Sequence, residues 1–304
     1  MQNRRLSFLL IIVLSAIIYI ARGQGCSDAG FCTLGSFKSG GLDSTSRFRN
    51  QLKVGVSYGS ADHSISIFGT HFDYQRVLNK KLVLNAKLSS LSQSGNGISA
   101  FGFSDLFLNV DYPIHEIGKL TVGFKLPLND GSKFRDNLPL PMDYQSSLGT
   151  LDFLLGISRE LNNFHLALAF QLPLSQNQNE FIAEDYPADS PLKQFQTTNR
   201  FIRRGDMMVR VAYPLTINNN FKITPGLLPI IHLGKDKYTD KQGIERAIDG
   251  SQGLTLNGTV HIDYEMNDKH SIQLNAGAPF IVRKERPDGL TRGFIAALEY
   301  RRKF

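Results

Sequence analysis

The chain has 304 residues, of which 20% are charged and 10% are aromatic, and its 34 basic residues exceed its 27 acidic residues by seven. This excess is mild, and no cluster of Lys and Arg is interleaved with aromatic residues, so nucleic acid is a poor candidate partner. Beyond the N-terminus no apolar run approaches the roughly 20 residues of a membrane-spanning helix, which argues against a bundle of transmembrane helices.

A secretory signal peptide is the first predicted element, at residues 1–23. Arg4 and Arg5 precede an apolar run, Leu6–Ile20, and small residues surround a cleavage site after Gly23. A spanning helix needs about 20 apolar residues, and this run is shorter, so a cleaved leader is favoured over an uncleaved membrane anchor. Cleavage removes three basic residues and lowers the charge excess of the mature chain to four.

Residues 24–47 follow as a segment rich in Gly and Ser that contains Cys26 and Cys32. An exported protein meets oxidising conditions, which favours a small disulfide loop between the two cysteines. A zinc site is disfavoured, because their spacing matches no usual zinc pattern and no His lies nearby. The segment is either a loose periplasmic tail or a plug inside the β-barrel that the rest of the chain predicts.

From residue 48 to residue 304 apolar residues repeatedly alternate with polar or small ones, as in Phe164, Leu166 and Leu168. Successive side chains of a strand point to opposite faces, so each segment has one apolar face and one polar face. Many segments exceed the length of about 5–6 residues that is usual in soluble strands and reach the 9–11 that a tilted membrane strand needs. The pattern predicts an all-β protein, a transmembrane antiparallel up-and-down β-barrel.

About twelve strands are predicted, at residues 50–60, 63–77, 81–90, 100–113, 119–128, 146–160, 164–175, 200–217, 221–234, 253–266, 270–282 and 291–304. An even number places both ends of the barrel on one side of the membrane. Five connections are short and rich in Asn, Asp, Gly or Lys, which tolerate tight turns. The others are longer, apart from one near Ser60, and a long one is predicted at 89–99. Short periplasmic turns and longer extracellular loops are typical of outer-membrane barrels.

Aromatic residues mark the membrane boundaries. Tyr74, Tyr112, Tyr213 and Tyr264 precede four of the five short turns. Their amphipathic rings suit the level of the lipid headgroups and predict an aromatic girdle. The last strand alternates and ends on Phe304, which resembles the signal read by the barrel-assembly machinery. The predicted partners are therefore this machinery, outer-membrane lipid and lipopolysaccharide.

The alternation also predicts which polar residues face the lumen. These are Asn85, Lys87, Asn109, Asp111, Lys125, Asp152, Glu160, His165, Lys222, His261, Asp263, Glu265, Glu299 and Arg301. Charges of both signs fit two interpretations. The lumen is either a wet pore whose charges set selectivity, or a nearly closed interior held together by paired charges.

Three stretches resemble a known family: Gly102–Asp105, Gly123–Pro127, and Leu148–Asp152 with Gly156. Their order resembles the outer-membrane transporters named after the meta-pathway of phenol degradation, which are similar to toluene and long-chain fatty-acid channel barrels. The resemblance covers mainly residues 100–160. It implies a barrel that passes small molecules, hydrophobic or aromatic ones included, and it identifies no single cargo.

These features together predict an outer-membrane channel or transporter of a Gram-negative bacterium, without a cofactor, a metal or an enzymatic activity. The alternative is a non-transporting barrel, either structural or a hydrolase of the phospholipase type. A hydrolase needs a nucleophile and a base within hydrogen-bond reach. The seven His residues are scattered singly, and none lies in a motif beside a plausible nucleophile, so no catalytic residue is predicted.

Overall fold

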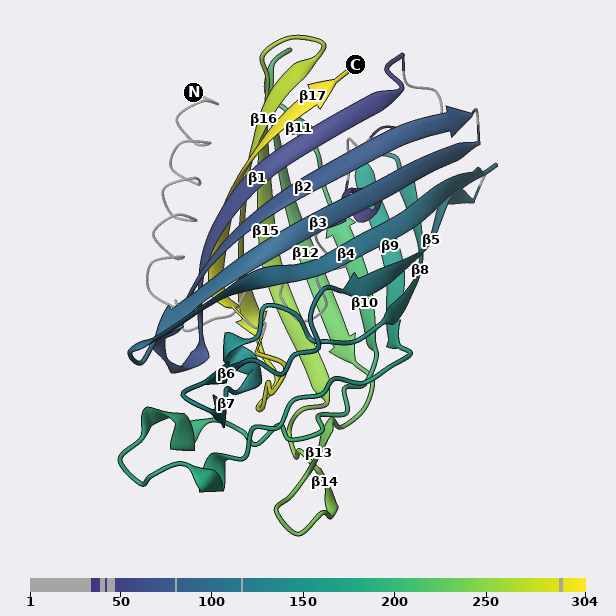
Figure 1. Cartoon of the computed structure of the whole chain (residues 1–304). Coiled ribbons are helices and arrows are strands. Elements are labelled where there is room, and N and C mark those ends of the chain that lie inside the picture. The colour runs from purple at the N-terminus through teal and green to yellow at the C-terminus, as the bar shows by residue number, and fades with distance from the viewer. Residues whose placement is uncertain (1–33, 39–41, 43–46, 80, 116, 290–291) are drawn as a thin grey trace.

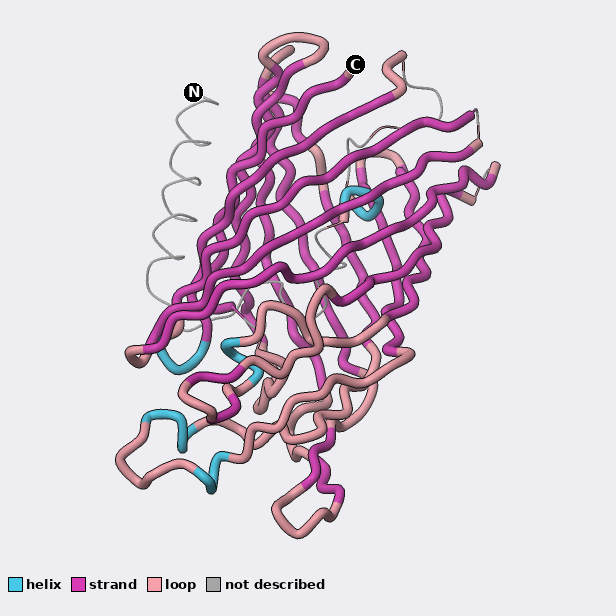
Figure 2. Tube along the Cα trace, in the orientation of Figure 1, coloured by secondary structure: helices cyan, strands magenta, loops and turns pink. Residues whose placement is uncertain are grey.

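The computed structural model describes residues 34–38, 42, 47–79, 81–115, 117–289 and 292–304 (Figure 1). These residues form a closed antiparallel barrel of twelve strands, with short hairpins and 3-10 helices outside the wall (Figure 2). Among the described residues, no helix has the length and apolarity of a membrane-spanning helix. The predicted signal peptide and the two cysteines lie outside the described residues.

Each strand of the wall pairs with its neighbours in sequence, as predicted for an up-and-down barrel. The wall strands are β1 (Asn50–Ala61), β2 (Ser66–Asn79), β3 (Leu82–Gly95), β4 (Ile98–Ile114), β5 (Gly118–Pro127), β8 (Asp152–Leu161), β9 (Phe164–Pro173), β10 (Asp206–Ala212), β12 (Phe221–His232), β15 (Gly253–Glu265), β16 (His270–Ile281) and β17 (Arg292–Lys303). The last strand returns to the first, with Val54 opposite Tyr300, which closes the barrel.

The period of two in the sequence explains which face of each strand meets lipid. On β1, Val54, Val56 and Tyr58 are exposed on the outer surface, whereas Gln51 and Lys53 point inward and are buried. Apolar side chains outside and polar ones inside are the arrangement of a barrel whose wall faces hydrocarbon. The predicted transmembrane barrel is thereby confirmed, since a soluble barrel would bury the apolar face instead.

The two ends of the barrel differ. We call the end with the connections β2–β3, β4–β5, β8–β9, β10–β12 and β15–β16 the turn end, and the opposite end the loop end. Both termini of the barrel lie at the turn end, where the backbone N–H of Asn50 donates to the carbonyl of Phe304 at 2.9 Å. Figure 1 shows the C-terminus and the short turns at the top and the long loops at the bottom.

The predicted long loop at 89–99 is wrong. β3 continues to Gly95, and β4 begins at Ile98. Asn96 and Gly97 form the turn between them, with φ angles of 52° and 70°. Asn-Gly is the favoured pair for a two-residue hairpin turn, because both positions need positive φ. The connection through 62–65 is short as well, so the loop end carries long loops at four of its six connections.

The predicted strands 146–160 and 200–217 are also too long at the loop end. They begin only at Asp152 and Asp206, because the residues before them bond to loops and side chains instead of a neighbouring strand. β10 ends at Ala212, since Pro214 lacks the N–H that a ladder needs. The chain then resumes as β11 (Leu215–Thr216) against β12.

The long loops fold over the loop end as a cap with an apolar core. The cap contains η4 (Met142–Tyr144), η5 (Ala183–Asp185), η6 (Pro191–Gln194), and the hairpins β6 (Phe134–Arg135) with β7 (Leu138–Pro139) and β13 (Lys237–Thr239) with β14 (Glu245–Ala247). Tyr144 and Phe181 are fully buried and pack in one cluster with Ile67, an inward residue of β2. Burial of this kind is the main source of stability in a folded unit, so the cap is a packed structure that continues the barrel.

The carboxyl group of Asp143, in η4, gives the cap a pH dependence. Burial raises the pKa of Asp143 to about 7, and the nearby carboxylates of Asp62 and Asp288 also raise it. The folded state holds this proton more tightly than an unfolded chain, so the stability it contributes is present below about pH 4 and is lost as the pH rises towards 7. Amide exchange in the cap, corrected for its intrinsic pH dependence, is expected to be faster at pH 8 than at pH 5. Asp143→Asn is expected to remove the difference, and equal exchange in the unchanged protein would contradict the assignment.

Candidate functional site

The residues predicted to line the lumen mostly lie inside the barrel. Ten of them are buried: Asn85, Lys87, Asn109, Asp111, Lys125, Asp152, His165, His261, Glu299 and Arg301. Lys222, Asp263 and Glu265 are partly exposed. The side chain of Glu160 is 59% exposed at the turn end, where it bonds to His165. That these residues line a path for solutes stays a prediction.

The three stretches that carry the family resemblance converge on one buried cluster beneath the cap. Lys125 of β5 donates to Asp152 of β8 at 2.8 Å and to the hydroxyl of Thr150 at 2.9 Å. Asp105 of β4 accepts from the hydroxyl of Ser147 at 2.6 Å. Lys125 and Asp152 are 1% and 0% exposed, so their charges are stabilised by each other and not by water. The motifs therefore fasten the loop between β5 and β8 to the wall.

Two glycines of the same stretches stand where a side chain would collide with its surroundings. Gly149 has a φ of +66°, and a methyl group there would lie 2.3 Å from the carbonyl oxygen of Asp130. Gly156 faces the lumen, and a methyl group there would lie 2.5 Å from the ring of Phe37. Glycine is needed at the first position for its backbone conformation and at the second for a close approach.

Gly149→Ala is expected to lower the free energy of unfolding by about 1–3 kcal/mol, because the backbone oxygen of Asp130 cannot move aside and the left-handed φ is strained. Gly97→Ala is the matched control, since Gly97 has a φ of +70° but open space around it. The measurement is the urea midpoint of the folded band on unboiled gels. Equal shifts for the two variants would show that the contact with Asp130 does not matter.

A second buried network joins three loops at the loop end. Arg203 donates to Asp206 at 2.5 Å, and Arg283 donates to Asp288 at 3.0 Å. His232 lies between two carboxylates, with Nδ1 2.7 Å from Asp206 and Nε2 2.8 Å from Asp236. Carboxylate oxygens accept only, so both ring nitrogens of His232 must donate, which makes the ring a cation. All six side chains are 0% exposed, so this buried polar network holds the loops of the cap together.

A third network lies towards the turn end. Glu299 on β17 contacts His71 at 3.0 Å and accepts from Arg301 at 2.6 Å. Arg301 also donates to Asp263 on β15 at 3.0 Å. The contacts of this network reach from β17 past β1 to β2 and past β16 to β15. Of the two interpretations of the lumen, this pairing fits the closed interior held by paired charges in the state described.

A short N-terminal segment, Leu34–Lys38 with η2 (Gly35–Phe37), lies inside the barrel and contacts opposite walls. Near β1, a methyl group at Gly35 would lie 2.7 Å from Nζ of Lys53. Ser36 accepts from Asn109 of β4 at 2.7 Å, and the carbonyl of Phe37 accepts from Nε2 of His165 on β9 at 3.2 Å. Figure 2 shows η2 as a short helical turn among the strands. Residues 34–38 therefore cross the lumen.

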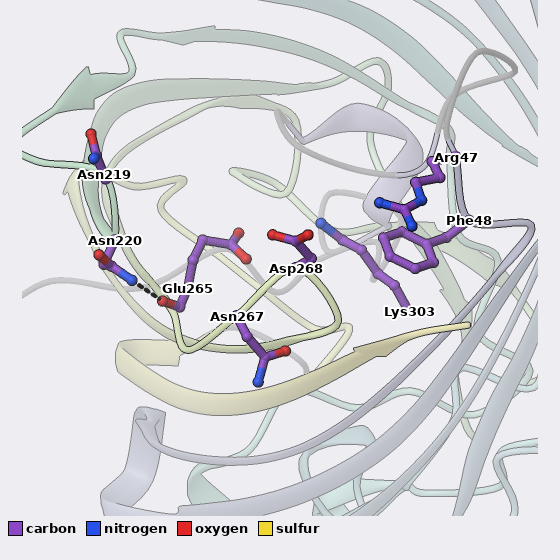
Figure 3. Close-up of a pocket in the computed structure, with 8 residues that line it drawn as sticks. All are labelled: Arg47, Phe48, Asn219, Asn220, Glu265, Asn267, Asp268 and Lys303. Carbon is purple, nitrogen blue, oxygen red and sulfur yellow. Dashed lines mark hydrogen bonds between the residues drawn. The ribbon is translucent and has the colours of Figure 1, made fainter.

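The mouth at the turn end contains a cleft of about 450 Å³ (Figure 3). Two cations, Arg47 and Lys303, lie on one side, and two carboxylates, Glu265 and Asp268, lie towards the other. The cleft opens to solvent and is lined by charges of both signs, so it forms a solvent-accessible mouth at the turn end of the barrel.

The predicted girdle residues and the terminal Phe lie at the turn end. Tyr112 and Tyr264 are 39% and 49% exposed on the outer surface, and Tyr74 and Tyr213 are partly exposed. Phe304 is 51% exposed. The opposite boundary carries Phe101 and Phe103 at 64% and 58% exposed, together with Tyr58 at 55%. That these rings contact headgroups and that Phe304 is read during assembly stay predictions.

Five described His residues, among them His165, form side-chain hydrogen bonds to groups other than a Ser or Thr hydroxyl. His71 and His232 contact carboxylates, His261 contacts an amide and a guanidinium, and His270 contacts the hydroxyl of Tyr300. In the part of the chain that the structure describes, no group of three His, Cys, Asp or Glu could hold a metal ion. The predicted disulfide between Cys26 and Cys32 lies outside the described residues.

The buried polar network of the cap was not predicted from the sequence. Asp206 and His232 are inward residues at the loop ends of β10 and β12, so alternation could have found them. Arg203 was placed within a predicted strand that does not extend so far. Asp236 and Arg283 lie in loops, where no periodicity tells which residues meet.

No family model and no curated protein matches the sequence. An outer membrane channel from Pseudomonas putida F1 matches the fold with a TM-score of 0.58 and 16% identity, over 88% of this chain and 99% of that one. The translocator domain of the autotransporter NalP from Neisseria meningitidis has a TM-score of 0.48 and 9% identity, over 88% and 91% of the two chains. The CymD monoaromatic hydrocarbon channel has 0.46 and 9%, over 92% and 98%. The first similarity shows the fold, an outer-membrane type of barrel. The resemblance to the phenol meta-pathway transporters stays a prediction.

Proposed function

We propose that the chain is an outer-membrane channel for small molecules, hydrophobic or aromatic ones included, and that the structure shows its closed state. The observation that carries the proposal is the segment Leu34–Lys38, which crosses the lumen and is held there by contacts such as Ser36–Asn109 and Phe37–His165. A barrel that served only as a wall could fill its lumen with side chains of its own strands. A separate segment can leave without unfolding the barrel, so we assign it the role of a plug, within an N-terminal unit of residues 24–47.

The orientation follows from the proposed location. With the turn end in the periplasm, the first barrel strand begins on the periplasmic side, and the cap faces the outside. The Pseudomonas putida protein shares this barrel fold and is called an outer membrane channel, which supports a channel function for this chain. Lipopolysaccharide around the cap and the assembly machinery at Phe304 are the partners that this location implies.

The alternative is a non-transporting barrel, and the pairing of buried charges favours its structural version. The pair Lys125–Asp152 and the network around His232 tie the wall and cap together without requiring a solute. The two functions differ in one outcome. A channel has an open state that solutes can use, and a structural barrel stays sealed in every state.

The test is solute entry into liposomes that contain the purified protein, with conductance across planar bilayers as a second readout. We expect low basal conductance with brief openings, and faster solute entry than in liposomes that contain the heat-unfolded protein. Barrels that are folded by gel mobility but impermeable, also after the plug is dislodged, would contradict a channel. Hydrolysis of lipid that is lost on changing one His would favour the enzymatic alternative.

A further inference from the structure

The lumen wall has an apolar recess about halfway along β8 and β9. Gly156 lies opposite Ala169 in the strand register, and Ala167 is the neighbouring inward residue of β9. Three adjacent inward positions thus carry at most a methyl group, which hollows the wall. Larger buried apolar side chains surround them: Phe107, Leu154, Met208, Leu228 and Ile230.

The ring of Phe37 fills this recess. A methyl group at Gly156 would lie 2.5 Å from Cε1 and 2.8 Å from Cζ of Phe37, so the ring lies directly on the backbone of Gly156. Phe37 is 0% exposed, and it belongs to one apolar cluster with Ala167 and Ala169. The recess therefore has the size and chemistry of a planar six-membered ring.

Two polar side chains at the edge of the recess bond both to the segment and to the wall. Asn109 donates to the hydroxyl of Ser36 at 2.7 Å, and Nε2 of His165 donates to the carbonyl of Phe37 at 3.2 Å. On the wall, Asn109 also contacts Asp111 at 3.4 Å and His165 contacts Glu160 at 2.7 Å. Both side chains are buried, so each loses one of its two acceptors when the segment leaves. An oxygen on the ligand that replaces Phe37 would supply one.

We infer that the recess of Gly156, Ala167 and Ala169 binds the ring of a monocyclic aromatic molecule that carries a hydrogen-bonding oxygen, and that Phe37 occupies this site in the closed state. The inference rests on the proposed function and narrows its cargo. Because Phe37 competes with the ligand from within the chain, the apparent affinity of the ligand is its intrinsic affinity multiplied by the fraction of molecules whose site is vacant. Ligand binding and the closed position of the segment exclude each other.

The experiment measures saturable binding of 4-fluorophenol to the full mature chain in detergent, by ¹⁹F NMR. Two variants remove the ring of Phe37 from the recess, one leaving the recess empty and the other filling it. Phe37→Ala removes the competitor and leaves the recess intact, and we expect at least about tenfold tighter binding than in the unchanged protein. Ala169→Leu fills the recess and expels Phe37, and we expect saturable binding to be lost. Ala167→Leu repeats the second test at a neighbouring position, in case one variant fails to fold.

Solute entry into liposomes is measured on the same variants, so that failure of the site and failure of the channel are separated. If the variants change binding as expected but no variant admits solute, the binding site is supported and the channel function is contradicted. Solute entry with binding that is indifferent to both Ala169→Leu and Ala167→Leu would overturn the site and leave the channel. Absence of saturable binding to the unchanged protein and to Phe37→Ala would also overturn the site.

Discussion

Replacing Arg203 by Met is expected to lower the free energy of unfolding by about 3–5 kcal/mol, because the three buried carboxylates of the network then face two cations, His232 and Arg283, instead of three. Arg203 donates to Asp206 at 2.5 Å and lies 3.8 Å from Asp288, and all three side chains are 0% exposed. Met keeps most of the volume of the Arg side chain, so the loss reports charge and hydrogen bonding more than packing. The cap should loosen first, since Arg203 lies in a loop and not in the wall.

The measurement is the urea midpoint of the folded gel band, because the chain has no Trp for a fluorescence assay. Arg246→Met is the matched control. Arg246 donates to Asp240 at 2.8 Å in the same cap, but its side chain is 54% exposed, so water screens the pair and we expect a much smaller shift of the midpoint. If Arg203→Met and Arg246→Met shift the midpoint equally, the buried network around Arg203 does not stabilise the cap more than an exposed ion pair does.

The wall of the barrel could be predicted from the sequence because each residue of a strand has only two orientations. A lipid-facing residue such as Val54 and a lumen-facing residue such as Lys53 are separated by one step along the chain. That rule identified the twelve strands and the buried positions of Asn109, Lys125 and Glu299. It does not locate the turn at Asn96-Gly97, because alternation alone does not separate a two-residue turn from the predicted loop at 89–99.

The alternation rule does not predict the contacts of the cap or of the segment inside the lumen. Arg203 and Asp236 meet through loops with no repeat, and nothing in the local sequence of either residue names the other. The ring of Phe37 lies on Gly156, which is 119 residues further along the chain. The sequence shows that position 156 is Gly but not what approaches it. Contacts of this kind depend on the whole fold, so only the motif glycines hinted at them.

Gly156→Leu is expected to expel Phe37 and to raise solute entry by about tenfold or more, on the proposal that Leu34–Lys38 is the plug. A Leu side chain needs the volume that the ring now fills, since even a methyl group would lie 2.5 Å from it. The neighbours on the other side are wall residues such as Ala169, whose backbone belongs to the sheet and cannot retreat. The segment is held by a few noncovalent contacts, each worth about 0.5–1.5 kcal/mol, so the segment yields before the wall does.

Gly258→Leu is the matched control for this variant. Gly258 lies in β15, and a methyl group there would lie 2.7 Å from the ring of Phe280. Phe280 is 70% exposed on the outer surface, so its ring moves into lipid and the lumen is unchanged. Both substitutions place the same side chain against a phenyl ring in a strand of the wall, and they differ in the face they occupy. Faster solute entry with Gly156→Leu alone would follow from a plug at Phe37. Equal entry for the two folded variants would mean that the segment crosses the lumen without closing it.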